Sequence, residues 1–372
     1  MYLFDNLRNT YTKEQFSAQE AQHLAHLYSW GPVVFQVARL MNKYGIFAML
    51  AESKAGLTRR EICEQTDLSD YSVKCLLESS LTMQTILLRE QADGEDKFVL
   101  AKTGWFLLRD QMIRANIDFN HDVNYEGWFL LDKALEEGKP AGLKHFGDWK
   151  TLYEGLSSLP NQVQKSWFGF DHYYSDHSFD EALQIILSHH PRSDVKLLDI
   201  GGNTGRFALH CVETSADIEV TICDLPQQIE LMRSATAGKK GAERIDGIGV
   251  NLLDPNQELP TDRYFDVVWM SQFLDCFGEE EIVSILTRAR KIMQPDTRIY
   301  IMETLWDRQD YAPAAFCLTQ TSLYFTALAN GNSKMYNTDD MTRLIEQSGL
   351  QIEQIYDRIG NGGHSVIVIS NK

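Results

Sequence analysis

The sequence has no apolar run long enough to span a membrane, because charged residues interrupt even its most apolar segments, such as 195–200 and 298–302. It has no C-x-x-C pair, and its six cysteines and ten histidines form no cluster at the spacing of a metal site. Residues 1–10 include Asp5 and Arg8 and have no apolar centre of the signal-peptide type. We therefore expect a cytoplasmic protein with reduced thiols, no structural zinc and no metal cofactor.

Basic residues are scarce relative to acidic ones: 35 Lys and Arg stand against 52 Asp and Glu, which gives a net charge of −17. Such a charge disfavours nucleic-acid phosphates and anionic membrane surfaces as partners. The content of 44% hydrophobic and 23% charged residues is that of a globular protein. A chain of 372 residues is too long for one ordinary hydrophobic core, so we expect two domains.

The most informative segment is a glycine cluster directly after an apolar strand, Leu197-Leu198-Asp199-Ile200-Gly201-Gly202-Asn203-Thr204-Gly205. Glycine allows positive φ and a close approach of the backbone to a ligand, and the next helix directs free N–H groups into the turn. The spacing does not match the G-x-G-x-x-G of dinucleotide sites. Asp224, at the end of the following strand, is placed to accept hydrogen bonds from both hydroxyls of an unphosphorylated ribose. The pattern therefore predicts a nucleoside site.

Strands and helices alternate after Pro191, which predicts a Rossmann-like, doubly wound α/β sheet. Only the turn 360–363 separates the last two expected strands. It is too short for a helical crossover, so these strands should pair antiparallel. The seven expected strands are residues 195–200, 218–223, 245–251, 265–270, 298–303, 350–356 and 365–369.

The first part of the chain has a mostly helical pattern from about residue 30 to residue 110. Thr58 and Glu61 form a capping box for a second helix, and Asp70 can cap a third. Two short strands, 85–89 and 97–100, follow the helices around a turn at 92–95. Three helices followed by a hairpin make a winged-helix arrangement. Because acidic residues flank and occupy the third helix, packing and dimerisation are favoured over DNA binding.

These patterns divide the chain into three expected parts. Residues 1–112 form the winged-helix-like domain, and residues 191–372 form the nucleoside-binding domain. Between them, residues 113–190 form an aromatic-rich helical linker that could wall an apolar pocket.

With these features together, the chain resembles the class I S-adenosylmethionine-dependent O-methyltransferases that carry an N-terminal winged-helix dimerisation domain. The motifs that carry the resemblance are Leu198 to Gly205, Asp224-Leu225-Pro226, Ser271-Gln272-Phe273-Leu274-Asp275, and Phe170 through Ser178. The resemblance implies S-adenosyl-L-methionine as cofactor, a small and often phenolic or polyketide-type acceptor, and a homodimer formed through the N-terminal domain.

The resemblance also implies roles for individual residues. Ser178 would reach the cofactor's carboxylate, Asp224 would hold the ribose, and Asn251 stands where the family has an aspartate for the adenine amino group. The implied cofactor-binding residues are Ser178, Asp199, Gly201, Gly202, Asn203, Gly205, Asp224, Leu225, Asn251, Leu252, Ser271 and Gln272. The implied acceptor pocket contains Phe170, Tyr174, Phe316 and Tyr324.

The catalytic base differs from the family pattern. Asp275 stands where the family has a histidine, and the supporting glutamate expected near residues 333–336 is absent. Asp275 could itself be the base if burial raises its pKa toward neutrality, or proximity alone could suffice for a nucleophilic acceptor. A third possibility is a cofactor-binding relative that does not methylate, such as a decarboxylase or hydroxylase. His172 and His177 are alternative bases, and a winged-helix ligand sensor is an alternative function.

Overall fold

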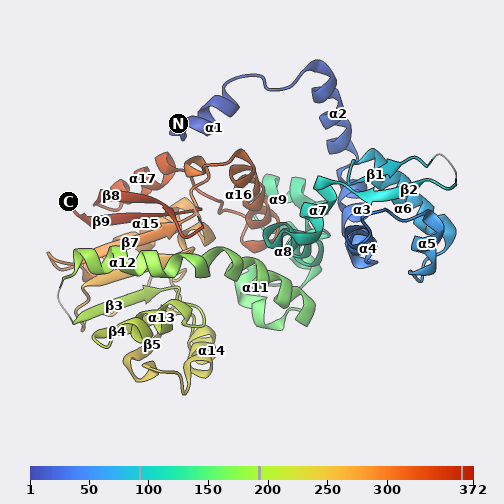
Figure 1. Ribbon diagram of the computed structural model, residues 1–372. Coiled ribbons are helices and arrows are strands. Elements are labelled where there is room, and N and C mark those ends of the chain that lie inside the picture. Colours follow the sequence, from blue (N-terminus) through green and yellow to red (C-terminus); the bar gives the residue numbers. More distant parts are fainter. Residues whose placement is uncertain (92–93, 192–193, 362) are drawn as a thin grey trace. The chain divides into compact units, whose positions relative to one another are not determined.

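The computed structural model describes residues 1–91, 94–191, 194–361 and 363–372, without the side chains of residues 172–176. It contains two compact units (Figure 1). The smaller unit is residues 14–123, and the larger unit combines residues 1–13 with residues 124–372. This division differs from the expected domains at both ends of the smaller unit. Residues 1–13 pack with the distant C-terminal part of the chain, and the helix after residue 110 continues the smaller unit.

The smaller unit is mainly helical. It contains one antiparallel hairpin, and two more helices follow this hairpin. Gly45, at φ +71°, separates the third helix from the fourth. The core of the smaller unit contains Ile46, Phe47, Leu77 and Ile86. The elements are α2 (Ala18–Ser29), α3 (Gly31–Lys43), α4 (Ile46–Glu52), α5 (Arg59–Glu64), α6 (Asp70–Thr82), β1 (Ile86–Arg89), β2 (Lys97–Leu100), α7 (Lys102–Arg109) and α8 (Gln111–Phe119).

The helix caps of this unit confirm one expectation and correct another. The Thr58–Glu61 capping box begins α5 as expected. Asp70 does not cap α6, because it is already the first helical residue, and the Ser69 hydroxyl accepts the hydrogen bond from the Ser72 N–H instead. Of the turn expected at 92–95, residues 92 and 93 lie outside the described residues.

Ser69→Ala should therefore destabilise the protein by about 0.5–2 kcal/mol, because α6 would lose its N-cap hydrogen bond. Asp70→Ala is the matched control: it removes an ion pair with Arg59, in which the Asp70 side chain is 66% exposed, and a weak contact with the Cys63 thiol at 3.8 Å. We expect a change of about 0–1 kcal/mol for such a pair. Chemical denaturation of both variants measures the difference, and an equal loss at the two positions would contradict the assignment of the cap.

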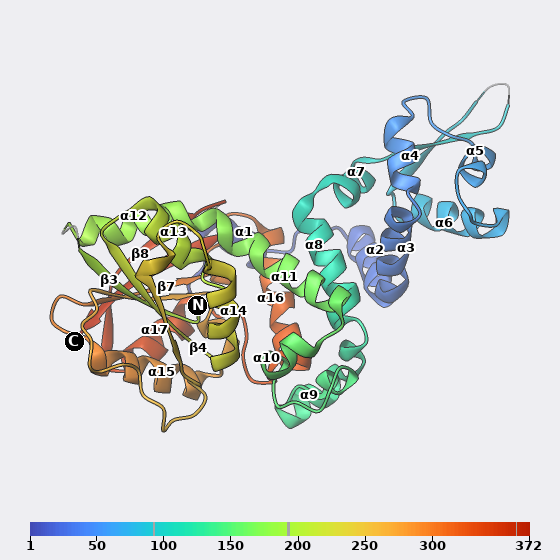
Figure 2. The ribbon, with the colours of Figure 1, turned by 90° about the horizontal axis from the view of Figure 1, so that it is seen from below.

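The larger unit contains the expected Rossmann-like sheet (Figure 2). Its strands are β3 (Val195–Ile200), β4 (Ile218–Asp224), β5 (Ile245–Gly249), β6 (Val267–Ser271), β7 (Arg298–Glu303), β8 (Leu350–Ile359) and β9 (His364–Asn371). The spatial order is β5-β4-β3-β6-β7-β9-β8, and the first five of these are parallel. Strand β9 pairs antiparallel with both β7 and β8, which confirms the prediction made from the short turn at 360–363.

Helices cover both faces of this sheet (Figure 2). On one face Leu198 and Ile200 of β3 pack with α15 (Glu279–Ile292) and α17 (Thr338–Gln347). On the other face Val195 and Leu197 pack with α12 (Phe179–His189), α13 (Arg206–Thr214) and α14 (Pro226–Thr236). The nearly continuous burial of β3 follows from this double cover, because a parallel strand between two helical layers has no solvent face.

The helical segments before the sheet and after β7 form the remainder of the larger unit. They are α1 (Asp5–Tyr11), α9 (Leu131–Glu137), α10 (Leu152–Gly155), α11 (Asn161–Ser175) and α16 (Ala312–Tyr324). Shorter 3-10 or π turns are η1 (Asn120–Asn124) at the boundary of the two units, η6 (Ala242–Arg244) between β4 and β5, and η7 (Leu274–Cys276) between β6 and β7. The others are η2 (Gly127–Leu130), η3 (Ala141–His145), η4 (Leu156–Ser158), η5 (Asp176–Ser178), η8 (Trp306–Arg308) and η9 (Phe325–Ala329).

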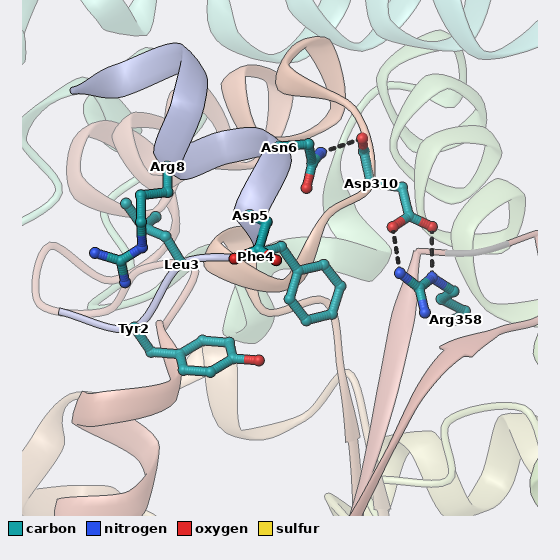
Figure 3. A pocket seen from close by; sticks show the side chains of 8 residues that line it. All are labelled: Tyr2, Leu3, Phe4, Asp5, Asn6, Arg8, Asp310 and Arg358. Carbon is teal, nitrogen blue, oxygen red and sulfur yellow. Dashed lines mark hydrogen bonds and ion pairs between the residues drawn. The ribbon is translucent and has the colours of Figure 1, made fainter. Parts of the chain in front are cut away.

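Residues 1–13 form an N-terminal arm on the larger unit (Figure 3). Leu7 is completely buried, and the Phe4 N–H donates to the Asp307 carbonyl at 3.0 Å. The Arg358 guanidinium lies 5.3 Å from the centre of the Phe4 ring and forms two hydrogen bonds with the Asp310 carboxylate. The arm is thus held by apolar, cation–π and backbone contacts to the segment after β7 and to β8.

The helices among the described residues include none with both the length and the apolar character that a membrane crossing requires. All six cysteines are in the described ranges and none forms a disulfide. Cys211 and Cys223 are buried and Cys75 is exposed.

Candidate cofactor and acceptor site

The glycine turn after β3 needs glycine at specific positions. Gly201 and Gly205 have φ values of +78° and +79°, in the left-handed region that favours glycine. The Gly201 N–H donates to the Cys223 carbonyl at 2.9 Å, which ties the turn to β4. A Cβ on Gly201 would overlap the Phe273 ring, and a Cβ on Gly202 would press on the Asp199 carboxylate. The turn therefore packs closely against both its own strand and the loop after β6.

Asp224 holds the turn from the end of β4. Its Oδ2 accepts a hydrogen bond from the Asn203 N–H at 2.8 Å, and its Oδ1 accepts one from the Leu225 N–H at 2.7 Å. Burial raises the pKa of Asp224, although these two donors oppose the shift. Each carboxylate oxygen has two lone pairs, so Asp224 can accept further hydrogen bonds from a ligand.

A cavity lies beside this turn. Six of the cofactor-binding residues expected from the sequence line it: Asp199, Gly201, Gly202, Asn203, Ser271 and Gln272. The other residues of its lining are Asp171, Phe179, Thr204, Arg206, Phe207 and Trp269. The strand register brings Trp269 there, because Trp269 is paired with Asp199 across β3 and β6. Strand pairing cannot be read from the sequence, so Trp269 was missed, whereas Thr204, Arg206 and Phe207 lie in or directly after the glycine motif.

The cavity combines an aromatic wall with acceptor atoms that lack partners. The Phe207 and Trp269 rings stack with centroids 4.5 Å apart. Within the described part of the chain, Asp199 Oδ2, Asn203 Oδ1 and Gln272 Oε1 are buried without a hydrogen-bond partner. Burial, with the charge of Asp224, raises the pKa of Asp199 to about 8. Buried acceptors of this kind need donors, and a ligand with hydroxyl and ammonium groups supplies them.

Other expected cofactor residues lie outside the cavity lining. Ser178 is fully buried, and its hydroxyl is hydrogen-bonded to His364 Nδ1 at 2.9 Å. Asn251 Oδ1 accepts the Leu253 N–H at 3.0 Å, and Leu252 packs in the core of the sheet. The remaining ones, Gly205, Asp224 and Leu225, border the turn or follow β4.

The loop after β6 carries Asp275, which is buried within η7. Burial raises the pKa of Asp275 to about 6. The Cys276 thiol lies 3.5 Å from Asp275 Oδ1. Gln272 of this loop lines the cavity, and Phe273 packs over Gly201 of the glycine turn. The loop therefore leads from the cavity to Asp275.

A second buried carboxyl, Glu303 at the end of β7, holds this loop. Its Oε1 accepts hydrogen bonds from the N–H groups of Phe273 at 3.1 Å and Leu274 at 2.9 Å. Burial and the neighbouring Asp275 raise the pKa of Glu303 well above its usual range. Sequence reasoning missed Glu303. The available signal was an acidic residue at the end of a strand that should lie near β6.

The segment near residues 333–336, where a supporting glutamate was expected, contacts the same loop through neutral groups. The Tyr336 hydroxyl donates to the Phe277 carbonyl at 2.7 Å. Just before it, the Asn330 side-chain amide donates to the Cys276 carbonyl at 2.6 Å. The Asp275 loop is thus held by a carboxyl from β7 on one side and by an amide and a phenol on the other.

Aromatic residues surround the Asp275 loop. Burial raises the pKa values of Tyr153 and Tyr324, and Asp275 and Cys276 are close enough to raise both further. The Trp167 indole N–H donates to the Tyr324 hydroxyl at 2.8 Å. Phe170 is partly buried, whereas Phe316 is 58% exposed.

Of the two alternative bases, His172 and His177, the structure describes the side chain of His177. His177 is an exposed residue of η5 and is not part of the cavity lining. The side chains of His172 and Tyr174 lie outside the described residues.

Comparisons with known proteins agree with this architecture. Residues 22–98 match the Dimerisation2-like domain, and residues 198–299 match a methyltransferase domain. The chain is 23% identical over 177 residues to the mitomycin biosynthesis 6-O-methyltransferase of Streptomyces lavendulae. The aligned segment covers 48% of each chain. It is 20% identical to the acetylserotonin O-methyltransferase of Macaca mulatta, over 80% of this chain and 84% of that one.

A solved structure has the same fold. The human N-acetylserotonin methyltransferase in complex with SAM superimposes with a TM-score of 0.62 at 16% identity, and the match covers 97% of this chain and 99% of that one. The chain therefore combines a Dimerisation2-like domain with a methyltransferase domain, and the similar proteins are S-adenosylmethionine-dependent O-methyltransferases. The cofactor of this methyltransferase is S-adenosyl-L-methionine, and the unpartnered acceptors and aromatic wall of the cavity fit its hydroxyl, ammonium and adenosyl groups.

Proposed function

We propose that this methyltransferase transfers a methyl group to a hydroxyl oxygen of a small aromatic or polyketide-like compound. The observation that carries the proposal is the buried Asp275 carboxyl, on the loop that begins at the cofactor cavity and is surrounded by aromatic side chains. The similar proteins from Streptomyces lavendulae and Macaca mulatta are both named as O-methyltransferases. Their names favour methylation over decarboxylation or hydroxylation.

In the proposed mechanism Asp275 accepts the proton of the acceptor hydroxyl. With a pKa of about 6, most of its population is deprotonated near neutral pH. Glu303 fixes the loop that carries Asp275, and the aromatic groups of Trp167 and Tyr324 keep water away from the reacting oxygen. Bound S-adenosylmethionine supplies an electrophilic methyl group on a sulfonium, so no metal is needed for the displacement.

Methyl transfer can be tested with cofactor labelled in its methyl group and a panel of phenols and hydroxylated aromatics. We expect label in an extractable product, at an oxygen by mass spectrometry. Measurement of released carbon dioxide and of hydroxylated products covers the alternative activities. Cofactor binding without label transfer to any member of the panel, accompanied by either of those products, would contradict the proposal.

We propose that Asp224 binds the ribose and that Leu225, Asn251 and Leu252 adjoin the adenine. Asp224→Ala should weaken binding of S-adenosylhomocysteine by about 1–3 kcal/mol, as for a lost hydrogen bond in a buried site. Isothermal titration calorimetry measures this change, and Asp246→Ala, an acid of β5 paired with Arg263 at the surface, is the matched control. Equal affinities of the Asp224→Ala variant and the unaltered protein would place the ribose elsewhere.

We further propose that the protein is a cytoplasmic homodimer in which residues 14–123 are a winged-helix dimerisation module. All residues of α2 are described and none is buried, while Tyr28, Trp30 and Val33 are 73%, 64% and 48% exposed. An apolar surface of this kind on a matched dimerisation domain favours self-association.

Trp30→Glu should weaken the dimer by about 2 kcal/mol or more, as expected for a central aromatic residue of an interface. Sedimentation equilibrium at several protein concentrations measures the mass of the particle and so the strength of the dimer. Tyr71→Glu is the control, because Tyr71 is 76% exposed on α6. A monomer at all concentrations before any substitution would rule out the dimer.

A further inference from the structure

Two charged side chains line the cofactor cavity and have no part in the site described so far. Asp171 belongs to α11, and Arg206 is the first residue of α13, directly after the glycine turn. Arg206 is the one basic residue in the lining that the described residues provide. Asp171 lies in the motif Phe170 through Ser178 and Arg206 directly follows the glycine motif, but neither was among the expected site residues.

The rest of the lining provides little charge. Phe179, Phe207 and Trp269 are apolar, and the pKa of Asp199 is raised to about 8, so its carboxyl is mostly neutral near pH 7 before a cation binds. Among the described residues of the lining, Arg206 and Asp171 therefore carry the remaining charges, one positive and one negative. The helix dipole at the start of α13 adds to the positive potential around Arg206.

The cofactor has complementary charges at one end, because its methionine tail ends in a carboxylate and an ammonium group. Ser178, the residue expected to bind the carboxylate, is buried and hydrogen-bonded to His364. The Gly360 backbone also packs against its hydroxyl. The carboxylate consequently needs another donor. The fork of N–H groups on a guanidinium matches a carboxylate in shape and charge.

We propose that Arg206 binds the carboxylate of the methionine tail and that Asp171 binds its ammonium group. The inference rests on S-adenosylmethionine as the cofactor, and it assigns the tail to two residues on separate helices. These residues position the cofactor and take no part in the chemistry of methyl transfer.

Binding measurements with four ligands separate the two charges. S-Adenosylmethionine and its decarboxylated form differ only in the carboxylate, whereas S-adenosylhomocysteine and 5′-methylthioadenosine differ in the whole amino-acid tail. Calorimetry on the full chain compares Arg206→Met and Asp171→Asn with the unaltered protein. Arg343→Met is the control, because Arg343 lies on α17 and pairs with Glu279 at the surface.

The unaltered protein should bind S-adenosylmethionine about tenfold to hundredfold more tightly than the decarboxylated form, the range for a charge-assisted hydrogen bond. Arg206→Met should bring this ratio close to one, because it weakens only the two ligands that carry the carboxylate, S-adenosylmethionine and S-adenosylhomocysteine. Asp171→Asn should weaken both sulfonium ligands and S-adenosylhomocysteine but leave 5′-methylthioadenosine unchanged. Arg343→Met should change none of the four affinities.

Two results would overturn the assignment. An unchanged ratio in Arg206→Met means that another group binds the carboxylate. Equal weakening of 5′-methylthioadenosine means that the variant has damaged the fold of the cavity rather than the tail site. If the unaltered protein binds none of the four ligands, S-adenosylmethionine is not its cofactor. That result differs from tight binding of S-adenosylmethionine and its decarboxylated form with equal affinity, which would contradict only the tail site.

Discussion

Asp275→Asn should lower kcat for methyl transfer by about 10²–10⁴-fold, the usual contribution of a general base. The substitution keeps the size of the side chain and removes its ability to accept a proton. Cofactor affinity should not change, because Asp275 is not part of the cavity lining. Single-turnover measurements with saturating labelled cofactor give the rate directly. Asp262→Asn, in an exposed loop, is the control.

The pH dependence of the unaltered enzyme provides a second readout. A base must be deprotonated to act, and burial raises the pKa of Asp275 to about 6. The rate should therefore fall as the pH decreases through about 6 and reach a plateau above it. In Asp275→Asn this step should disappear. An unchanged rate with the same pH step would show that Asp275 is not the base and that the step belongs to another titrating group.

Gly201→Ala should destabilise the protein by about 2–5 kcal/mol, because two separate effects add: a strained left-handed residue and an overpacked contact. The new Cβ would sit at φ +78° and would overlap the Phe273 ring. Moving Phe273 shifts the loop that carries Asp275, so both cofactor affinity and turnover should fall. Thermal denaturation and calorimetric titration measure the two effects.

Gly169→Ala is the matched control for this substitution. Gly169 lies within α11, has no atom within 4 Å of the position of a Cβ, and does not have the positive φ of Gly201. Alanine should stabilise a helix at such a position by about 0.5–1 kcal/mol. Alanine should therefore lower the free energy of unfolding at position 201 and raise it at position 169. A stable Gly201→Ala variant with normal cofactor affinity would mean that the turn can relax without using the left-handed conformation.

Features set by local chemistry were predictable from the sequence. The strand positions, the antiparallel end of the sheet and the glycine turn follow from periodicity, a loop too short for a crossover, and the conformational freedom of glycine. The cap of α6 was placed one residue late, because Ser69 and Asp70 are both good caps and only the geometry chooses between them.

Features set by pairing across the sheet were not predicted. The support of the Asp275 loop by Glu303 depends on β6 and β7 being neighbours, and the place of Trp269 depends on its register with β3. Ser178 lies in a recognisable motif, yet contact with His364, 186 positions away in the sequence, determines its environment. Long-range contacts of this kind leave no periodic signal in either segment.

The N-terminal arm has a consequence for the order in which the protein is made. Residues 1–13 are synthesised before their binding surface, which includes Asp307, Asp310 and Arg358. During most of translation the apolar side chains of Phe4 and Leu7 therefore have no native partner. The residues of the smaller unit, 14–123, are all synthesised early, whereas the larger unit is complete only when residues 1–13 meet the segment after β7 and strand β8.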